Sequence, residues 1–446
     1  MSRRLSVLAL LLVGGCAARY ESDTRHALRA ATRAMQQESV EQAGAPGTLA
    51  SYVTRALADR PRLQAELARW RAATLRIEAA RRIPEPTVTY GFYALPVQTR
   101  VGPQRHRVSI RQTLPWPTQI GAAADAQSAR ARASQRRFEA RALGVRREVA
   151  DAWWSLWLVR RSRIVLEEQA SLVAALAESQ RGQLEVGRGS LADVAQVELA
   201  QTRLQDRIAG LDPEEHAAEA RLRAATGLGP DVPVPTTGNP PRARRPSIGE
   251  ARLREAVATH PFVAEFALRA EAAREQAGVE EAARFPRLML GADWIETGAA
   301  AMPVDGSGQD ALIVSVGLSV PLYQDSYGAA QRAAEADATA FEADGQDAVT
   351  QALGELAAAL SALEDARRRS ETYTNTMLPQ ATEVYASVLG AVAVGEAPLA
   401  AALLATRDRL EIGLMTLRAR ADHGRAWARL EAIVGHPVPA REAETP

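Results

Sequence analysis

The residue types that most often perform catalysis or bind metals are sparse in this sequence. Its six histidines, at positions 26, 106, 216, 260, 423 and 436, show no mutual metal-ligand spacing. There is neither a glycine-rich phosphate loop of the Walker type nor a Gly-x-Ser-x-Gly motif. His260 precedes Pro261, a pattern typical of a helix start. We therefore predict no catalytic residue, no metal site and no cofactor.

The single cysteine, Cys16, has the clearest chemical context. It follows a basic segment at residues 1–4 and an apolar segment at 5–13. This arrangement resembles a bacterial lipobox, in which residues 1–15 are removed as a signal peptide and Cys16 is lipidated, with palmitate among its acyl chains. Ala17, in place of Asp, resembles an outer-membrane address. An ordinary cleaved signal peptide and a short buried helix are the alternatives.

The composition indicates long helices. Of the 446 residues, 47% are hydrophobic but only 5% are aromatic. The net charge of +1 disfavours nucleic acid as a partner, and one cysteine excludes a disulfide framework. No long apolar run follows Cys16. Any membrane-spanning part would therefore consist of β-strands, because only helices and closed barrels satisfy the backbone hydrogen bonds in lipid.

The chain is an internal duplication. His260-Pro261 follows Arg60-Pro61 by 200 positions, and Val394-Gly395 follows Val186-Gly187 by 208. Other landmarks recur in the same order. The predicted segments are a signal peptide (1–15), a lipidated N-terminal segment (16–47), repeat one (48–227), a Pro/Gly-rich linker without regular structure (228–247), repeat two (248–438) and a polar tail (439–446).

Each repeat has the same predicted anatomy: a helix, two strands, a very long helix, a tight turn and a long return helix. The period-two alternation of apolar and polar residues predicts strands at 87–95 and 108–114 in repeat one, and at 288–295 and 312–320 in repeat two. Apolar spacing typical of helices predicts continuous helices at 120–186 and 327–394.

The number of strands limits how they could span a membrane. A transmembrane barrel needs at least about eight strands, and an open sheet in lipid leaves unpaired edges. If these four strands span a membrane, several subunits must therefore share one barrel, and three chains would give twelve strands. The alternative is a soluble four-stranded sheet packed on helices.

These features resemble the TolC family of outer membrane efflux proteins over residues 48–438. The resemblance rests on the duplication, a proline closing the second strand, a glycine opening the long helix (Gly121 and Gly328), and Val-Gly-x-x-x-Leu at each tip. It implies a mainly α fold with a small β part, in which a homotrimer forms an α-barrel tunnel in the periplasm and a shared 12-stranded transmembrane β-barrel. It also implies an exit duct of a tripartite efflux system. Its partners would be a periplasmic adaptor (membrane fusion protein) and an inner-membrane pump of the RND type.

The stretch Leu114-Pro-Trp-Pro-Thr-Gln-Ile-Gly121 resembles the heavy-metal branch of that family. Thr118 stands where that branch commonly has glycine. Independently of cargo, two prolines at a strand end predict a rigid corner, and Trp116 would anchor at the membrane interface.

Two hairpin tips are the predicted docking surface. A glycine can adopt the left-handed conformation that ends a helix, and Ser190 or Pro398 suits the start of the next one. By resemblance to the family, the tips would face the adaptor. The residues carried over are Val186, Gly187, Ser190, Leu191 and Asp193 in repeat one, and Val394, Gly395 and Leu399 in repeat two.

Gating is predicted at the same tips. Family members carry aspartates after the second tip, but Ala401 and Leu404 occupy those positions here. The candidate gate is therefore Asp193, or an apolar constriction of Leu403 and Leu404. Two other functional classes remain open: a periplasmic adaptor lipoprotein bridging a pump to a separate channel, and a structural coiled-coil lipoprotein.

Overall fold

The computed structural model describes residues 20–41, 45–237 and 243–442. They form two compact units. The first contains residues 20–29, Ala68–Arg136 and Ala264–Gln346, and the second contains Ala30–Leu67, Arg137–Val263 and residues 347–442. Each unit takes segments from both predicted repeats. The contacts that hold a unit together therefore run between the repeats as well as within them.

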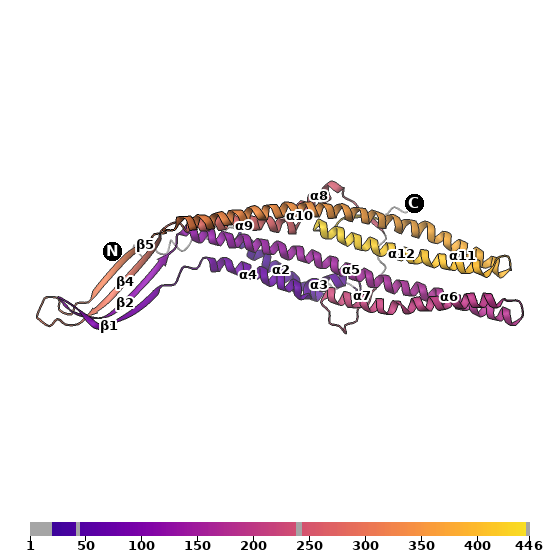
Figure 1. Ribbon diagram of the computed structural model, residues 1–446, viewed down its shortest axis with the longest axis horizontal. Helices are drawn as coiled ribbons and strands as arrows, with labels where there is room; N and C mark the ends of the chain where they lie inside the picture. Colours follow the sequence, from indigo (N-terminus) through magenta and orange to yellow (C-terminus); the bar gives the residue numbers. More distant parts are fainter. Residues whose placement is uncertain (1–19, 42–44, 238–242, 443–446) are drawn as a thin grey trace. The chain divides into compact units, whose positions relative to one another are not determined.

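The first unit contains the four-stranded sheet (Figure 1). Its strands are β1 (Thr87–Thr99), β2 (Gly102–Leu114), β4 (Arg287–Thr297) and β5 (Ala311–Ser319). Their order is β1-β2-β4-β5, and every neighbouring pair is antiparallel. The predicted strands are confirmed, with β1, β2 and β4 extending beyond the predicted bounds. The two hairpins join through β2 and β4, so the central pairing links the repeats.

Alanine-rich helix contacts form the helical part of the first unit. Helices α4 (Pro61–Ala80) and α9 (Pro261–Ala282) precede the two hairpins, and part of α2 (Glu21–Glu41) belongs here as well. Ile77 and Ala73 of α4 pack with Ala124 and Ala131 of α5 (Pro117–Glu185). Because alanine side chains are short, the two helix backbones approach closely at this contact.

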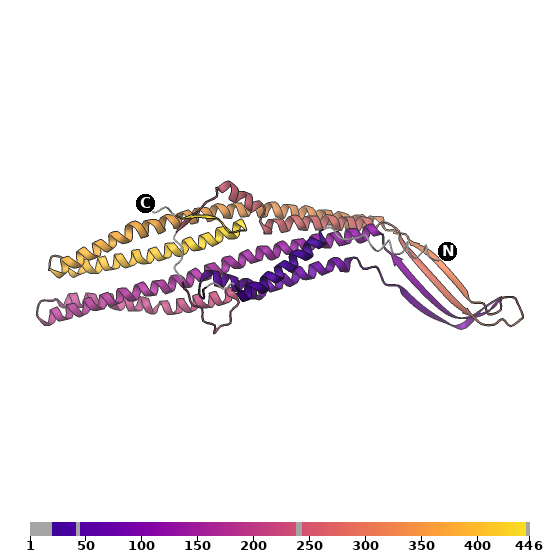
Figure 2. The ribbon, with the colours of Figure 1, turned by 180° about the vertical axis from the view of Figure 1, so that it is seen from behind.

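The second unit consists of helical hairpins. The end of α5 runs along α6 (Leu191–Ala209), and α11 (Leu378–Ala393) runs along α12 (Leu399–Val434), as both views show (Figures 1 and 2). Helices α3 (Leu49–Asp59), α7 (Leu211–Thr226) and α8 (Glu250–Ala258) complete it.

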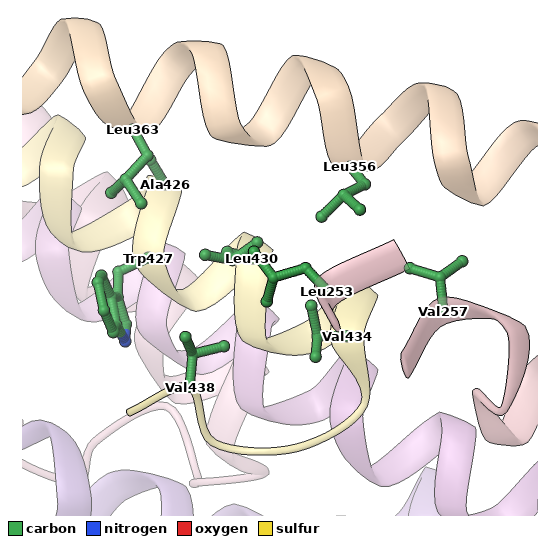
Figure 3. Close-up of a cluster of buried hydrophobic side chains, with 9 residues drawn as sticks. All are labelled: Leu253, Val257, Leu356, Leu363, Ala426, Trp427, Leu430, Val434 and Val438. Atoms are coloured by element: carbon green, nitrogen blue, oxygen red, sulfur yellow. The ribbon is translucent and has the colours of Figure 1, made fainter. Parts of the chain in front are cut away.

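A hydrophobic cluster fixes α8 against α10 (Gln324–Thr372) and α12 in the second unit (Figure 3). Leu430 is fully buried between Leu253 and Val257 of α8 and Leu356 of α10. Trp427 lies in the same cluster and stacks beneath the guanidinium of Arg244, 4.1 Å from the ring centre.

Two predicted continuous helices are interrupted. The helix predicted at 327–394 consists of α10, a π-helical turn at Tyr373–Met377, and α11. Pro379 lies in the first turn of α11, where it lacks an N–H and its ring crowds the preceding turn, so the backbone widens before it. The return helix of repeat one divides into α6 and α7 at Gly210, three residues before Pro213.

The prediction that the linker lacks regular structure was wrong at its end. Residues Arg244–Pro246 form strand β3, which pairs antiparallel with β6 (Ala440–Glu442) in the predicted polar tail. Each segment is only three residues long, which is too short to signal a strand alone. Their pairing depends on the fold bringing residues almost 200 positions apart together.

Among the described residues, no helix has both the length and the apolar character required of a transmembrane span.

Candidate channel wall and hairpin tips

The sheet has one apolar face and one polar face. The register places Tyr90 opposite Val108, and Val108 opposite Trp294. Their side chains therefore share a face, which we call the apolar face. Its large side chains are exposed in the single chain, Val314 by 76% and Leu312 by 71%. Its other exposed members are Val88, Phe92, Ile110, Leu290, Val316 and Leu318. A face this apolar requires a non-aqueous neighbour.

The opposite, polar face contains a buried charge cluster. Asp293 of β4 pairs in register with Ser109 of β2, and both are 5% exposed. Arg107 donates to the Asp293 carboxylate from Nη2 at 2.7 Å and from Nε at 3.0 Å, and the Ser109 hydroxyl donates to the same oxygen. The carboxylate therefore accepts three hydrogen bonds, which offset the cost of its burial.

The corner between β2 and α5 is fixed by Trp116. Its indole Nε1 donates to the carbonyl of Pro286, which directly precedes β4, at 2.5 Å, while the ring remains 41% exposed. The predicted corner between strand and helix is present, and the Trp116 contact also joins the two repeats, which was not predicted. Anchoring of Trp116 at a membrane interface stays a prediction.

The two tips are closed by the same turn. In the first, the N–H of Arg188 donates to the carbonyl of Gln183 at 2.8 Å. In the second tip, the N–H of Glu396 donates to the carbonyl of Ala391 at 2.8 Å. Gly187 and Gly395 have φ angles of 71° and 82°, as left-handed helix ends require. The Ser190 hydroxyl accepts from the N–H of Ala192 at 3.1 Å, which confirms it as a helix cap.

The predicted tip residues differ in exposure. Val186 (69%), Leu191 (73%) and Val394 (71%) are exposed. Leu399 is only 6% exposed, because it packs against Val197 and the α5 residues Val173 and Ala177. Its packing holds the start of α12 against the first hairpin, so it contributes little to the exposed tip surface. Its part in docking stays a prediction.

The candidate gate residues lie near this cluster. Asp193 is half-buried in the first turn of α6, where the positive end of the helix dipole favours a carboxylate. Leu403 packs partly against the Leu399 cluster, whereas Leu404 is 58% exposed. Cys16 lies outside the described residues, and its lipidation stays a prediction.

No metal-binding group of three or more His, Cys, Asp or Glu residues occurs in the part of the chain that the structure describes. His260 has the helix-start role predicted for it, since its Nδ1 accepts from the N–H of Phe262 at 3.1 Å.

Sequence reasoning missed the Arg107–Asp293 pair. Asp293 is the only acidic residue on the polar face of the described strands, and Arg107 has the parity that places it on that face. That signal is visible only once β2 and β4 are known to be neighbours. Neither repeat contains both residues, so comparison of the repeats could not reveal it.

The described strands form a sheet with two unpaired edges, one polar face and one exposed apolar face, which are features expected of a subunit that contributes strands to a membrane channel. Comparisons with known proteins agree. Residues 252–436 match the family model for outer membrane efflux protein. A search of curated proteins gave no match.

Solved structures share the fold over most of the chain. The outer-membrane channel OprN is 19% identical with a TM-score of 0.72, covering 87% of this chain and 89% of OprN. The Campylobacter jejuni CmeC outer membrane channel is 13% identical with a TM-score of 0.70 and coverages of 87% and 86%. The Neisseria gonorrhoeae MtrE outer membrane channel is 15% identical with a TM-score of 0.68 and coverages of 87% and 89%.

Residues 252–436 therefore match the outer membrane efflux protein family, and the chain shares its fold with solved outer-membrane channels, as its sequence resemblance predicted. The adaptor interpretation is not favoured, because the family matched by the sequence and the structures sharing its fold are those of channels.

Proposed function

We propose that three copies of this chain form the exit duct of a tripartite efflux system. The observation that carries this proposal is the sheet, whose apolar face is exposed and whose edge strands β1 and β5 have no partners among the described strands. In each copy the strands alternate in direction, so β5 of one copy can pair antiparallel with β1 of the next. Twelve strands then close into one barrel with the apolar faces toward lipid and the polar faces inward.

The helical hairpins extend the duct in the periplasm in this proposal. The exposed tip residues Val186, Leu191 and Val394 meet a periplasmic adaptor, which couples the duct to an inner-membrane pump of the RND type. Lipidation of Cys16 adds an anchor in the outer membrane.

Engineered disulfides test the shared barrel. Within one chain, β1 and β5 are separated by two strands, hence by roughly 14 Å, which is beyond disulfide reach. We expect Thr89→Cys combined with Ile313→Cys, Ser315→Cys or Gly317→Cys to give covalent trimers in oxidised outer membranes for at least one pairing. Thr89→Cys alone is the control and gives no trimer ladder. Monomers from every pairing would contradict the proposal.

A deletion strain tests docking. The sensitivity of the deletion strain to copper, zinc and dyes is measured first. We expect the wild-type gene to restore resistance to each compound to which the deletion strain has become sensitive. Leu191→Asp should fail to restore it while still forming trimers, because a charge on this exposed leucine disrupts an apolar contact without affecting the core. Glu198→Asp, farther along α6, is the matched control. Full resistance with Leu191→Asp would remove the first tip from the docking surface.

A further inference from the structure

The charges on the polar face of the sheet do not balance. The four strands contain the arginines at 105, 107, 111 and 287 and the acids Asp293 and Glu296. Asp293 is occupied by Arg107. Glu296 has the parity of the apolar face and lies 3.6 Å from His106. No acidic residue of these strands remains on the polar face to neutralise the other arginines.

Arg111 is the clearest charge on this face without a direct ion pair among the described residues. It is exposed and lies four residues from Arg107, hence on the same face. It pairs in register with Gly291, and its Cγ is 3.7 Å from the position that a Cβ of Gly291 would occupy, on the side where the Ser315 hydroxyl also lies. No ion pair of Arg111 occurs among the described residues, and its charge acts on Asp293 only at longer range.

Arg287 repeats this situation at the start of β4. It is exposed and has the same parity as Gly291 and Asp293. Its backbone N–H donates to the Ser319 hydroxyl at 3.2 Å, which fixes the strand end. In the described part of the chain its side chain also has no acidic partner.

We infer that Arg111 and Arg287 make the polar face of the sheet a specificity-determining wall that favours anionic over cationic solutes. This inference rests on the proposed trimer, which brings three copies of the wall around one passage. Guanidinium groups stay charged at every physiological pH, and charges of one sign lining a narrow passage concentrate counter-ions within it. Gly291 beside Arg111 leaves the Arg111 guanidinium room to reach a solute. The substrate class is a small molecule bearing a carboxylate or another anionic group.

The reversal potential of single channels tests the wall. The full-length protein is reconstituted in planar lipid bilayers under a potassium chloride gradient. We expect Arg111→Gln to shift the reversal potential toward the potassium equilibrium potential, and Arg111→Gln with Arg287→Gln to shift it further. Arg111→Lys, which keeps the charge, should retain the wild-type value. Arg254→Gln on α8, which removes an exposed arginine outside the sheet, is the matched control.

The outcomes separate the two proposals. Channels that open normally with an unchanged reversal potential in both glutamine variants would overturn the wall and leave the duct intact. The same shift in Arg111→Lys as in Arg111→Gln would also overturn it, since the charge would then not be the cause. A wild-type protein that forms no channel at all would overturn the duct itself, and the wall with it.

Discussion

At the scale of single residues, close packing explains why some helix positions hold a residue that has a low helix propensity. Gly424 lies inside the 36-residue helix α12, where glycine is unfavourable. A Cβ at this position would lie 1.9 Å from Cε2 of Trp154. Trp154 itself is edge-on to Trp153 and Trp157, so its ring cannot move aside without disturbing both neighbours. Glycine here is required by the tryptophan cluster.

Gly424→Ala is expected to destabilise the protein by at least about 1–3 kcal/mol, the range for overpacking in a core. The control is Gly354→Ala on α10, where no atom lies within 4 Å of the added Cβ. That change should stabilise the helix by up to about 1 kcal/mol. Urea unfolding in detergent measures both. A Gly424→Ala variant as stable as wild type would show that Trp154 moves freely.

His423 makes stability depend on pH. Burial lowers the pKa of this imidazole below its ordinary value of 6.5. Its Nε2 lies 3.0 Å from the Arg244 carbonyl, and Arg244 and Arg367 disfavour a positive charge here while Glu371 favours one. Below pH 6.5 the unfolded chain takes up a proton that the folded chain resists, so this contribution to stability is present above pH 6.5 and is lost as pH falls toward the folded pKa.

We therefore expect the free energy of unfolding to fall between pH 7 and pH 5, and to fall less in His423→Gln. Urea unfolding at pH 7, 6 and 5 gives the slopes. Burial lowers the pKa of His260 as well, so part of the wild-type slope should persist in this variant. His216→Gln, at an exposed position, is the control. An unaltered slope in His423→Gln would be evidence against this assignment.

At the scale of elements, the two hairpins end in the same turn but begin their return helices differently. Ser190 caps α6 through its side chain, whereas Pro398 opens α12 without a side-chain hydrogen bond. The start of α12 is held instead by burial of Leu399. The first tip therefore depends on a local hydrogen bond, and the second on packing.

Ser190→Ala should cost about 1 kcal/mol, the typical value of a lost N-cap. The loss should be local, so hydrogen exchange of the amides at the start of α6 reports it better than global unfolding. Ser171→Ala is the matched control, because that hydroxyl only bonds back to the Glu167 carbonyl of its own helix. Equal protection of α6 in both variants would exclude a capping contribution.

At the scale of the whole molecule, the proposed trimer places two sets of charges along one passage. In that trimer the Asp193 carboxylates would converge at the tips, and the arginines of the wall would lie in the sheet. Their effects on ion selectivity have opposite signs. The passage would then prefer cations at the tips and anions at the sheet, so its charge selectivity would change along its length.

Asp193→Ala is expected to shift the reversal potential toward the chloride equilibrium potential, opposite to Arg111→Gln. Asp206→Ala, on the same helix but farther from the tip, is the control. Unchanged selectivity in Asp193→Ala would remove the acidic gate. The apolar alternative would then be tested by Leu404→Ser, which should raise conductance without altering selectivity.

Local signals in the sequence determined much of this protein. Period-two and helical spacing located the four strands and the long helices, and glycine followed by a capping residue located both tips. Alternation and helical spacing can be read from a single stretch, and a helix end forms from hydrogen bonds between residues close in the chain, so one stretch contains each of these signals. The duplication then revealed that the two tips are equivalent.

The tertiary structure decided what depends on distant partners. Pairing of β2 with β4 brings Arg107 to Asp293 and leaves Arg111 without a direct ion pair among the described residues. Packing buries Leu399 but leaves Leu191 exposed, although both occupy the same place in the repeat. Strand β3 exists only because β6 lies beside it. The alternation along one strand shows which residues share a face, but only the neighbouring strand determines which charges on that face are neutralised.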